Sequence, residues 1–423
     1  MLNHKITKFK NGLRLVTAPL ANTRAVTILF LHGVGSRYEK QEESGIAHFL
    51  EHMFFKGTYK RPKTIDIART LDSVGANYNA YTGDEYTGYF VRVANNHFDL
   101  GLDVLTDMLY NSKFDATEIE REKGVIVEEI NMIKDVPQSY VEYVMKELLW
   151  PNQPLGRIIT GTRETVTSFN RDTFTSFKDR FYQPENTVMV VAGGGNEDEW
   201  IEKIGKILDQ KENKKIPGFE KAESEQKEPS LKVFYKDTDQ AHFVIGYRGL
   251  KRTDPRRKIL KVMNKIMGGT MSSRLFIEVR ERRGLCYYIS SDIADYQDTG
   301  FWGAQAGVDI KRTEEAVKVI LEQFNKAKVK EVTNEELNRG KENYKGQLFL
   351  GLEESMNVAE FLAEQELFWN KIEDPDEIGR NIDAVTKDDI LKLNQEIFRP
   401  ENLNLAIVGP FKDEEKFRKL LNK

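Results

Sequence analysis

"FYQPENTVMVVAGG" at 181–194 and "IFRPENLNLAIVGP" at 397–410 are the two stretches that decide the fold. In each, a Pro-Glu-Asn triplet precedes an alternating apolar strand that a glycine closes. A polar segment, "SFNRDTF" or "AVTKDDI", comes before the triplet in both. Internal repeats are the first feature to weigh in a fold prediction. A duplicated domain is the simplest account, because the two stretches end two nearly equal halves of the chain.

A charged stretch, "DQKENKKIPGFEKAESEQKEP" at 209–229, separates the halves. It has lost apolar periodicity and contains a proline next to a glycine, which is typical of a linker. We therefore predict an N-terminal domain over 1–212, a linker over 213–229 and a homologous C-terminal domain over 230–423. At 423 residues the chain also exceeds the size at which single cores usually stop growing.

Strand and helix patterns mix in the first half without strict alternation. Strands are predicted from alternating β-branched and apolar residues at 12–19, 24–36, 77–83 and 85–93. Helices are predicted from apolar spacing at 44–58, with Ser44 as N-cap, and at 62–76, 98–111, 116–133 and 139–149. The pattern favours an α+β fold of two similar domains, each a mixed or antiparallel sheet covered by helices.

Composition excludes several classes of protein. Hydrophobic residues make up 39% of the chain and no stretch is long enough to cross a bilayer, so we expect no membrane association. A net charge of -4 gives no overall electrostatic attraction for nucleic acid. The basic run at 251–258 lacks interleaved aromatic residues, which favours a solvated turn over a nucleic-acid site. The N-terminus lacks the apolar core of a signal peptide, and the lone Cys286 excludes an internal disulfide. We expect a cytoplasmic protein.

Two of only 6 histidines lie in "GIAHFLEHMFFKGT" at 45–58. Residues four apart on a helix stand one above the other, so His48 and His52 can direct imidazole nitrogens at one metal ion. Glu51 flanks the same point and suits a general base. This is the H-x-x-E-H order of inverted zincins. The alternative is that two histidines pack on an apolar face.

A catalytic zinc needs a third protein ligand. The acid-rich helix "DATEIEREKGVIVEEINMI" at 115–133 is the best source. At about 100° per residue its isoleucines form a buried stripe, with Glu122 and Glu129 at the edge and Glu128 nearly opposite. One of the two edge acids could ligate zinc while the other orients a histidine. The alternative for any of these acids is a solvated helix face.

These residues resemble the pitrilysin family of inverzincin metallopeptidases, especially its mitochondrial-processing-peptidase-like branch. The resemblance spans nearly the whole chain and includes "HGVGSRYEKQEESGIAHFLEHMFFKGT" at 32–58. The family's E-R-E-x-x-V-I-x-E-E helix implies Glu129 as third zinc ligand and Glu122 as accessory glutamate. Its edge strand has an Asn-Ala pair that bonds the substrate backbone, which implies Asn79 and Ala80 and a peptide bound as an added β-strand.

The second half has no H-x-x-E-H motif, since the aligned "VMNKIMGGTMSSRLF" at 262–276 offers no histidine or acid. A second zinc is therefore not expected there. The segment at 268–289 resembles the family's C-terminal motif, which implies that Arg280 and Tyr287 hold the substrate. A guanidinium and a phenol can both donate to a carbonyl that gains charge in the transition state. The alternative is a surface arginine and a packed tyrosine.

The resemblance implies a metalloendopeptidase with one Zn²⁺ per chain, which hydrolyses short or unfolded peptides in a chamber formed by two chains. Its catalytic residues would be Glu51, Glu122, Arg280 and Tyr287. We expect a homodimer, because the zinc motif and the Arg280–Tyr287 pair are on one chain. The alternative is a non-catalytic core or scaffold subunit, or a peptide-binding subunit of a larger complex. The intact zinc residues argue against both.

Overall fold

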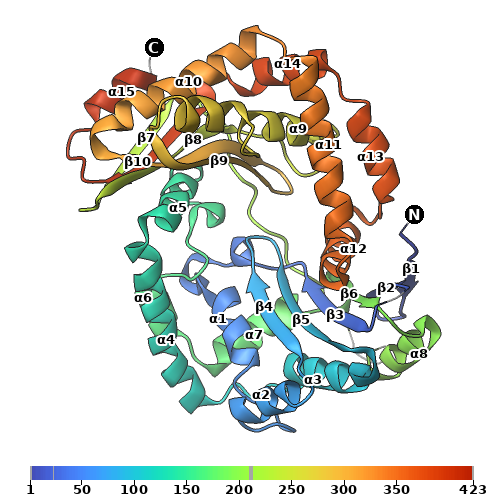
Figure 1. Ribbon diagram of the computed structural model, residues 1–423. Helices are drawn as coiled ribbons and strands as arrows, with labels where there is room; N and C mark the ends of the chain where they lie inside the picture. The colour runs from blue at the N-terminus through green and yellow to red at the C-terminus, as the bar shows by residue number, and fades with distance from the viewer. Residues whose placement is uncertain (1, 22, 209–212, 422–423) are drawn as a thin grey trace. The chain divides into compact units, whose positions relative to one another are not determined.

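Two compact units make up the structure (Figure 1), a computed structural model that describes residues 2–21, 23–208 and 213–421. The first unit comprises Met1–Ile130, Ile158–Glu220 and Phe349–Pro375. The second unit comprises Asn131–Arg157, Lys221–Leu348 and Asp376–Lys423. Each unit therefore contains segments from both halves of the sequence.

The sheet of the first unit has six strands among the described residues, in the order β1-β2-β6-β3-β5-β4. Its strands are β1 (Lys5–Lys8), β2 (Arg14–Pro19), β3 (Ala25–His32), β4 (Asn77–Thr82), β5 (Thr87–Ala94) and β6 (Thr187–Gly193). Only β2 and β6 pair in parallel within this sheet as described. The first Pro-Glu-Asn triplet forms a short turn, η5 (Pro184–Asn186), that leads into the fully buried β6.

The sheet of the second unit repeats this topology with the order β7-β11-β8-β10-β9. Its strands are β7 (Ser230–Tyr235), β8 (Gln240–Arg248), β9 (Cys286–Asp295), β10 (Gly300–Asp309) and β11 (Leu403–Gly409). The second triplet forms η8 (Pro400–Asn402) ahead of β11, and β11 pairs with β7 in parallel. The predicted α+β fold of two similar domains is confirmed.

Helices pack against both sheets. Those assigned to the first unit are α1 (Ile46–Phe54), α2 (Thr64–Asp72), α3 (Phe98–Asn111), α6 (Arg163–Ser168), α7 (Arg171–Phe181), α8 (Glu197–Leu208), α12 (Ser355–Trp369) and most of α4 (Ala116–Asp135). The second unit has α5 (Pro137–Leu149), α9 (Arg257–Met267), α10 (Thr313–Val329), α13 (Pro375–Asp383), α14 (Lys387–Ile397), α15 (Glu415–Leu421) and most of α11 (Asn334–Gly351). Short turns occur at η1 (Ser36–Tyr38), η2 (Gln41–Glu43), η3 (Asn95–His97), η4 (Pro154–Gly156) and η7 (Ile310–Arg312), and a π-helix at η6 (Phe276–Glu281).

One helix on each sheet comes from the opposite half of the sequence. Helix α12 packs on β3 and β6, where Val358 and Leu362 join the apolar side chains of those strands in one buried cluster. The hydroxyls of Ser355 and Thr27 share a buried hydrogen bond of 2.8 Å at the same contact. In the second unit, α5 packs on β11, β8 and β7 (Figure 1). The structure thus exchanges two equivalent helices between the repeats.

The predicted domain limits, 1–212 and 230–423, describe the repeat in sequence and stay a prediction. The compact units differ from those limits by the exchange of α5 and α12. Residues 213–229 of the predicted linker have no regular secondary structure, and 209–212 lie outside the described residues.

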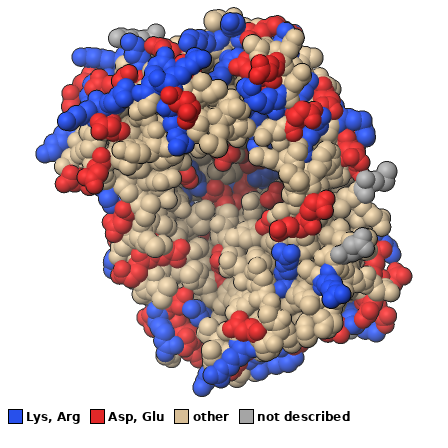
Figure 2. Space-filling view, viewed as in Figure 1, with Lys and Arg blue, Asp and Glu red and all other residues tan. Residues whose placement is uncertain are grey.

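Charges are mixed over the surface. Figure 2 shows Lys and Arg interspersed with Asp and Glu on the visible face of each unit. In the basic run at 251–258, Arg252 and Arg257 both hydrogen-bond to Asp295, so part of its charge is neutralised within the fold. No helix in the described part of the chain is long and apolar enough to cross a membrane.

Because α12 covers one face of the first sheet, a fragment of residues 1–220 leaves apolar residues such as Leu29, Leu31 and Val190 in water. We expect this fragment to bind a hydrophobic dye and to melt without a cooperative transition, since exposed apolar area is unfavourable. Adding residues 349–375 through a flexible linker should restore a cooperative thermal melt. The same fusion with Leu362→Asp is the control that should fail to do so. A cooperative melt of the fragment alone would contradict the exchange.

Candidate functional site

Helix α1 lies in the core of the first unit and carries His48, Glu51 and His52. Its apolar residues, including Phe49 and Met53, are fully buried against the sheet and neighbouring helices. The one-turn spacing brings the two imidazole ring centres to 4.7 Å from each other. Burial of the rest of the helix thus fixes which way the two histidines face.

The start of α1 is capped differently from the sequence prediction. Gly45, with φ of +95°, is the N-cap, so the prediction of Ser44 is wrong. The buried carboxylate of Glu39 accepts hydrogen bonds from the backbone N–H groups of Gly45 at 2.8 Å and Ala47 at 2.9 Å. An acid at this position satisfies free helix N–H groups and complements the helix dipole. A Cβ at Gly45 would lie 2.6 Å from the backbone oxygen of Thr160, which explains the glycine.

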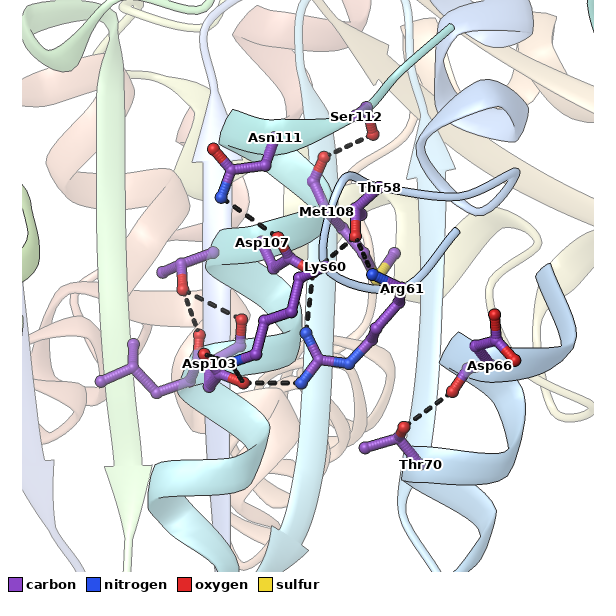
Figure 3. Close-up of polar contacts among 12 residues, drawn as sticks. Thr58, Lys60, Arg61, Asp66, Thr70, Asp103, Asp107, Met108, Asn111 and Ser112 are labelled. Carbon is purple, nitrogen blue, oxygen red and sulfur yellow. Dashed lines mark hydrogen bonds and ion pairs between the residues drawn. The ribbon is translucent and has the colours of Figure 1, made fainter. Parts of the chain in front are cut away.

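The loop after α1 is held on α3 by the buried polar network drawn in Figure 3. The hydroxyl of Thr58 donates to Asp107 at 2.6 Å, and Arg61 donates to Asp107 at 2.7 Å and to Asp103 at 2.6 Å. The two acids are one turn apart on α3, and Figure 3 shows Arg61 reaching both. Gly57, with φ of +116°, allows the backbone to turn into this loop. Both ends of α1 are therefore anchored by charged side chains.

Helix α4 presents Glu122 and Glu129 to α1. Glu122 is buried and Glu129 half-buried, while Glu128 is exposed, as the periodicity predicted. Ile126 and Ile130 are buried in the predicted stripe.

The ligand atoms predicted to hold a metal converge. His48 Nε2 lies 3.4 Å from Glu129 Oε1, and His52 Nε2 lies 3.7 Å from Glu129 Oε2. Ligand atoms about 2.0–2.1 Å from a tetrahedral zinc ion stand roughly 3.4 Å apart, so this geometry fits zinc with little movement. Among the described residues, these three form the one group of His, Cys, Asp or Glu side chains able to hold a metal ion.

Glu122 orients His52. Its Oε1 lies 2.9 Å from His52 Nδ1, and its Oε2 accepts a hydrogen bond from Lys56 Nζ at 2.6 Å. With the proton on Nδ1, the Nε2 lone pair of His52 faces the other ligand atoms, as in carboxylate–histidine–zinc arrangements. Burial raises the pKa of Glu122, but the hydrogen bonds from His52 and Lys56 outweigh it and leave this pKa below its ordinary value.

Glu129 is also held in its anionic form. The interaction with His48 lowers the pKa of Glu129 below its ordinary value, against the opposing effect of burial. The buried Nδ1 of His48 has no hydrogen-bond partner among the described atoms, in contrast to His52. Two imidazoles and one ionised carboxylate form a donor set that suits zinc.

The side chain of Glu51 contacts the edge strand β4. Its Oε2 accepts a hydrogen bond from the hydroxyl of Thr82 at 2.6 Å. Sequence reasoning missed both Thr82 and Lys56. Thr82 could have been found from the strand pattern, because side chains two residues apart on β4, such as those of Ala80 and Thr82, point to the same face of the sheet.

Asn79 and Ala80 lie on β4, which pairs with β5 alone among the described strands. Gly83 N donates to Tyr86 O beyond the Thr82–Thr87 pair. In an antiparallel ladder this makes Thr82 and Ala80 non-hydrogen-bonded positions, whose N–H and C=O groups face the free edge. The side chain of Asn79 is exposed and that of Ala80 is buried.

Arg280 and Tyr287 belong to the second unit and lie at two backbone irregularities. Arg280 is exposed on the π-helix η6, with its guanidinium 4.8 Å from the centre of the Phe276 ring. Tyr287 is the extra residue of a β-bulge in β9 and its side chain is 66% exposed. Both irregularities are over-represented at functional sites, and the exposure excludes a packed tyrosine.

The second unit lacks the metal ligands at the matching positions. Aligning the Gly-Thr pair at 269–270 with that at 57–58 puts Asn264 in the place of His52 and Leu260 in the place of His48. Asn264 Oδ1 accepts hydrogen bonds from Ser291 at 2.6 Å and from Trp302 at 2.9 Å, and Leu260 is fully buried. These side chains build a core rather than a metal site.

Two protein-family models match consecutive parts of the chain. A model of the insulinase family, peptidase family M16, matches residues 14–163, and a model of the peptidase M16 inactive domain matches residues 168–344. The uncharacterized zinc protease YmxG of Bacillus subtilis is 37% identical over 402 residues, which cover 95% of this chain and 97% of that protein.

Two solved structures share the fold. A protease from Helicobacter pylori has a TM-score of 0.91 at 24% identity and covers 97% of this chain and 100% of that one. A chain of complex III2 from Candida albicans has a TM-score of 0.85 at 18% identity and covers 99% of both. At these identities the likeness extends to the fold alone.

The convergence of ligand atoms predicts how zinc content changes in variants. Glu129→Gln should reduce bound zinc from one ion per chain to nearly none, because the anionic ligand is lost. Glu122→Gln should weaken zinc affinity by about 10- to 100-fold through loss of the His52 orientation. The exposed Glu128→Gln is the matched control and should bind zinc as the parent does. Atomic emission measures the zinc content, and competition with a chelator measures the zinc affinity. Loss of zinc in Glu128→Gln with retention in Glu129→Gln would refute the assignment.

Proposed function

The chain belongs to the M16 family of metallopeptidases, the pitrilysin family, and we propose that it is a zinc-dependent endopeptidase holding one zinc ion per chain. The observation that carries the proposal is the convergence of the His48, His52 and Glu129 ligand atoms, with Glu51 on the same helix as the two histidines. Relatives named zinc proteases support the same chemistry.

In this proposal the site residues of the first unit divide between holding the zinc ion and transferring a proton. His48, His52 and Glu129 hold the zinc ion, which when bound supplies a Lewis acid and a lowered pKa for water. Glu51 accepts the proton of the attacking water on its carboxylate and returns it to the leaving amine. The hydrogen bond of Thr82 to Oε2 leaves Oε1 of Glu51 for that proton.

The proposed substrate is a short or unfolded peptide bound as an added strand on β4. The backbone groups of Ala80 and Thr82 that face the free edge supply main-chain hydrogen bonds, and Asn79 adds a side-chain amide. A folded protein rarely offers an unpaired extended segment, so strand addition selects against folded substrates. Main-chain bonding also favours broad rather than strict sequence preference.

Arg280 and Tyr287 are proposed to bind the substrate backbone or the developing oxyanion. Their exposure and their irregular backbone support this role. We further propose a homodimer in which two chains form the chamber, and a cytoplasmic location. Zinc ligands and substrate-binding residues on one chain support identical rather than divided subunits.

A non-catalytic core subunit or a peptide-binding subunit is the second candidate. The shared fold with a chain of complex III2 favours it. A complete set of zinc ligands with a glutamate on the same helix favours the peptidase, because a scaffold has no need of either.

Glu51→Gln tests the peptidase proposal directly. The amide cannot take up the proton, so kcat should fall by about 100- to 10,000-fold while zinc stays bound at one ion per chain. His48→Ala should lose zinc and activity together. Hydrolysis of an internally quenched peptide and zinc content are measured on the same samples. If Glu51→Gln cleaves as fast as the parent, Glu51 is not the base.

If the peptide binds by strand addition, proline substitutions at neighbouring residues of β4 should have different effects. Ala80→Pro removes an N–H that faces the free edge, so kcat/KM should fall about tenfold or more while the melting temperature changes little. Asn79→Pro removes an N–H that bonds β5, so it should lower the melting temperature clearly. Steady-state kinetics and thermal melts separate the two. Unchanged kcat/KM in a well-folded Ala80→Pro variant would exclude main-chain bonding at this residue.

A further inference from the structure

Thr82 is the last residue of β4, and its hydroxyl makes the one side-chain hydrogen bond that the Glu51 carboxylate receives in the described part of the chain. The distance of 2.6 Å is that of a charge-assisted O–H···O⁻ bond, which is roughly twice as strong as a neutral one. Glu51 lies on a helix and Thr82 on a strand, so the bond ties two separate elements together. Sequence motifs do not assign this residue a role.

The backbone holds Thr82 firmly. The next residue, Gly83, donates its backbone N–H to Tyr86 O. Thr87, which pairs with Thr82 across the ladder, donates its hydroxyl to Val34 O at 2.8 Å. Threonine is β-branched, so few rotamers are open to it on a paired strand. The hydroxyl that reaches Glu51 therefore has a defined position before any ligand arrives.

Two sets of groups on Thr82 face two different partners. Its side chain faces α1 and bonds Glu51, while its backbone N–H and C=O face the free edge of β4. A peptide that adds to this edge bonds the strand on which the hydroxyl is mounted. The strand that aligns the peptide thus also fixes the carboxylate beside it.

We propose that Thr82 is a positioning residue, which holds Oε2 of Glu51 so that Oε1 faces the substrate bound on β4. This rests on the proposed function, because it assumes that Glu51 acts on water next to a peptide. A glutamate side chain has three rotatable bonds, and a carboxylate with no fixed partner samples several orientations. Misplacement of a reacting group by about 1 Å can lower the rate about 100-fold.

The competing explanation is that Thr82 only stabilises the hairpin. That role would change folding and metal binding together with activity, whereas positioning changes kcat alone. Thr82→Val keeps the shape and removes the hydroxyl, and Thr82→Ser keeps the hydroxyl and removes the methyl group. Thr27→Val is the matched control, since it removes another hydroxyl hydrogen bond of the same unit, the one shared with Ser355 under α12.

The experiment uses the full-length chain loaded with zinc and an internally quenched peptide. In Thr82→Val, kcat should fall about 10- to 100-fold, with KM within about twofold and zinc still at one ion per chain. Thr82→Ser should recover most of kcat, and Thr27→Val should keep the parental kcat. Parental kcat in Thr82→Val, failure of Thr82→Ser to recover, or a parallel loss of zinc would each overturn the proposal.

A second readout does not depend on activity. Crystal structures of the zinc-free parent and Thr82→Val variant should show the Glu51 carboxylate in one orientation in the parent and in several in the variant. The same single orientation in both would overturn the proposal. In the Glu51→Gln background, Thr82→Val should cause little further loss of kcat, because the two residues act as a unit. Failure of the proposed function is distinct: Glu51→Gln would then be as active as the parent, whatever Thr82 does.

Discussion

The hydrogen bond between His52 and Glu122 is the contact on which the site depends, because it joins α1 to α4 across 70 positions of sequence. Glu122 is 3% exposed and would be expensive to bury as an anion without partners. Lys56 supplies the second hydrogen bond and a compensating charge. Such partly buried ion pairs add little to stability, and apolar residues of similar size often serve stability as well. The network therefore has its best explanation in orienting a ligand.

The repeat was sufficient to predict the fold class, and the histidine motif to predict two of the proposed metal ligands. The choice of Glu129 over Glu122 as the third ligand came from the family resemblance. Both Pro-Glu-Asn triplets lead into central strands, and periodicity alone separated Glu129 from the exposed Glu128. These features are readable because they depend on local pattern. The start of α1 was not predictable, since Gly45 takes the N-cap position expected for Ser44 and the helix N–H groups are satisfied by Glu39, six and eight positions earlier in the chain. Thr82 was missed for the same reason: its partner lies 31 positions away on another element.

The exchange of α5 and α12 had no sequence signal either. The two helices have 13 and 15 residues, and apolar residues on a helix do not specify which of two equivalent sheets they cover. At the site, by contrast, the two repeats share a backbone arrangement but carry different side chains at equivalent positions. Asn264 and Leu260 stand where the histidines stand in the first unit, and the amide of Asn264 is used to hold Ser291 and Trp302.

The two edges of the first sheet differ in a way that bears on function. An unpaired strand edge invites pairing with other chains, and proteins commonly shorten such edges or place lysine on them. Strand β1 follows this rule, with four residues and a lysine at each end. Strand β4 does not, because its six residues, "NYNAYT", carry no charge and its free edge lies next to Glu51 through Thr82. An undefended edge is a hazard unless another strand is meant to bind there, and the hydrogen bond from Thr82 to Glu51 on the helix of the two histidines is the basis for proposing a peptide substrate as that strand.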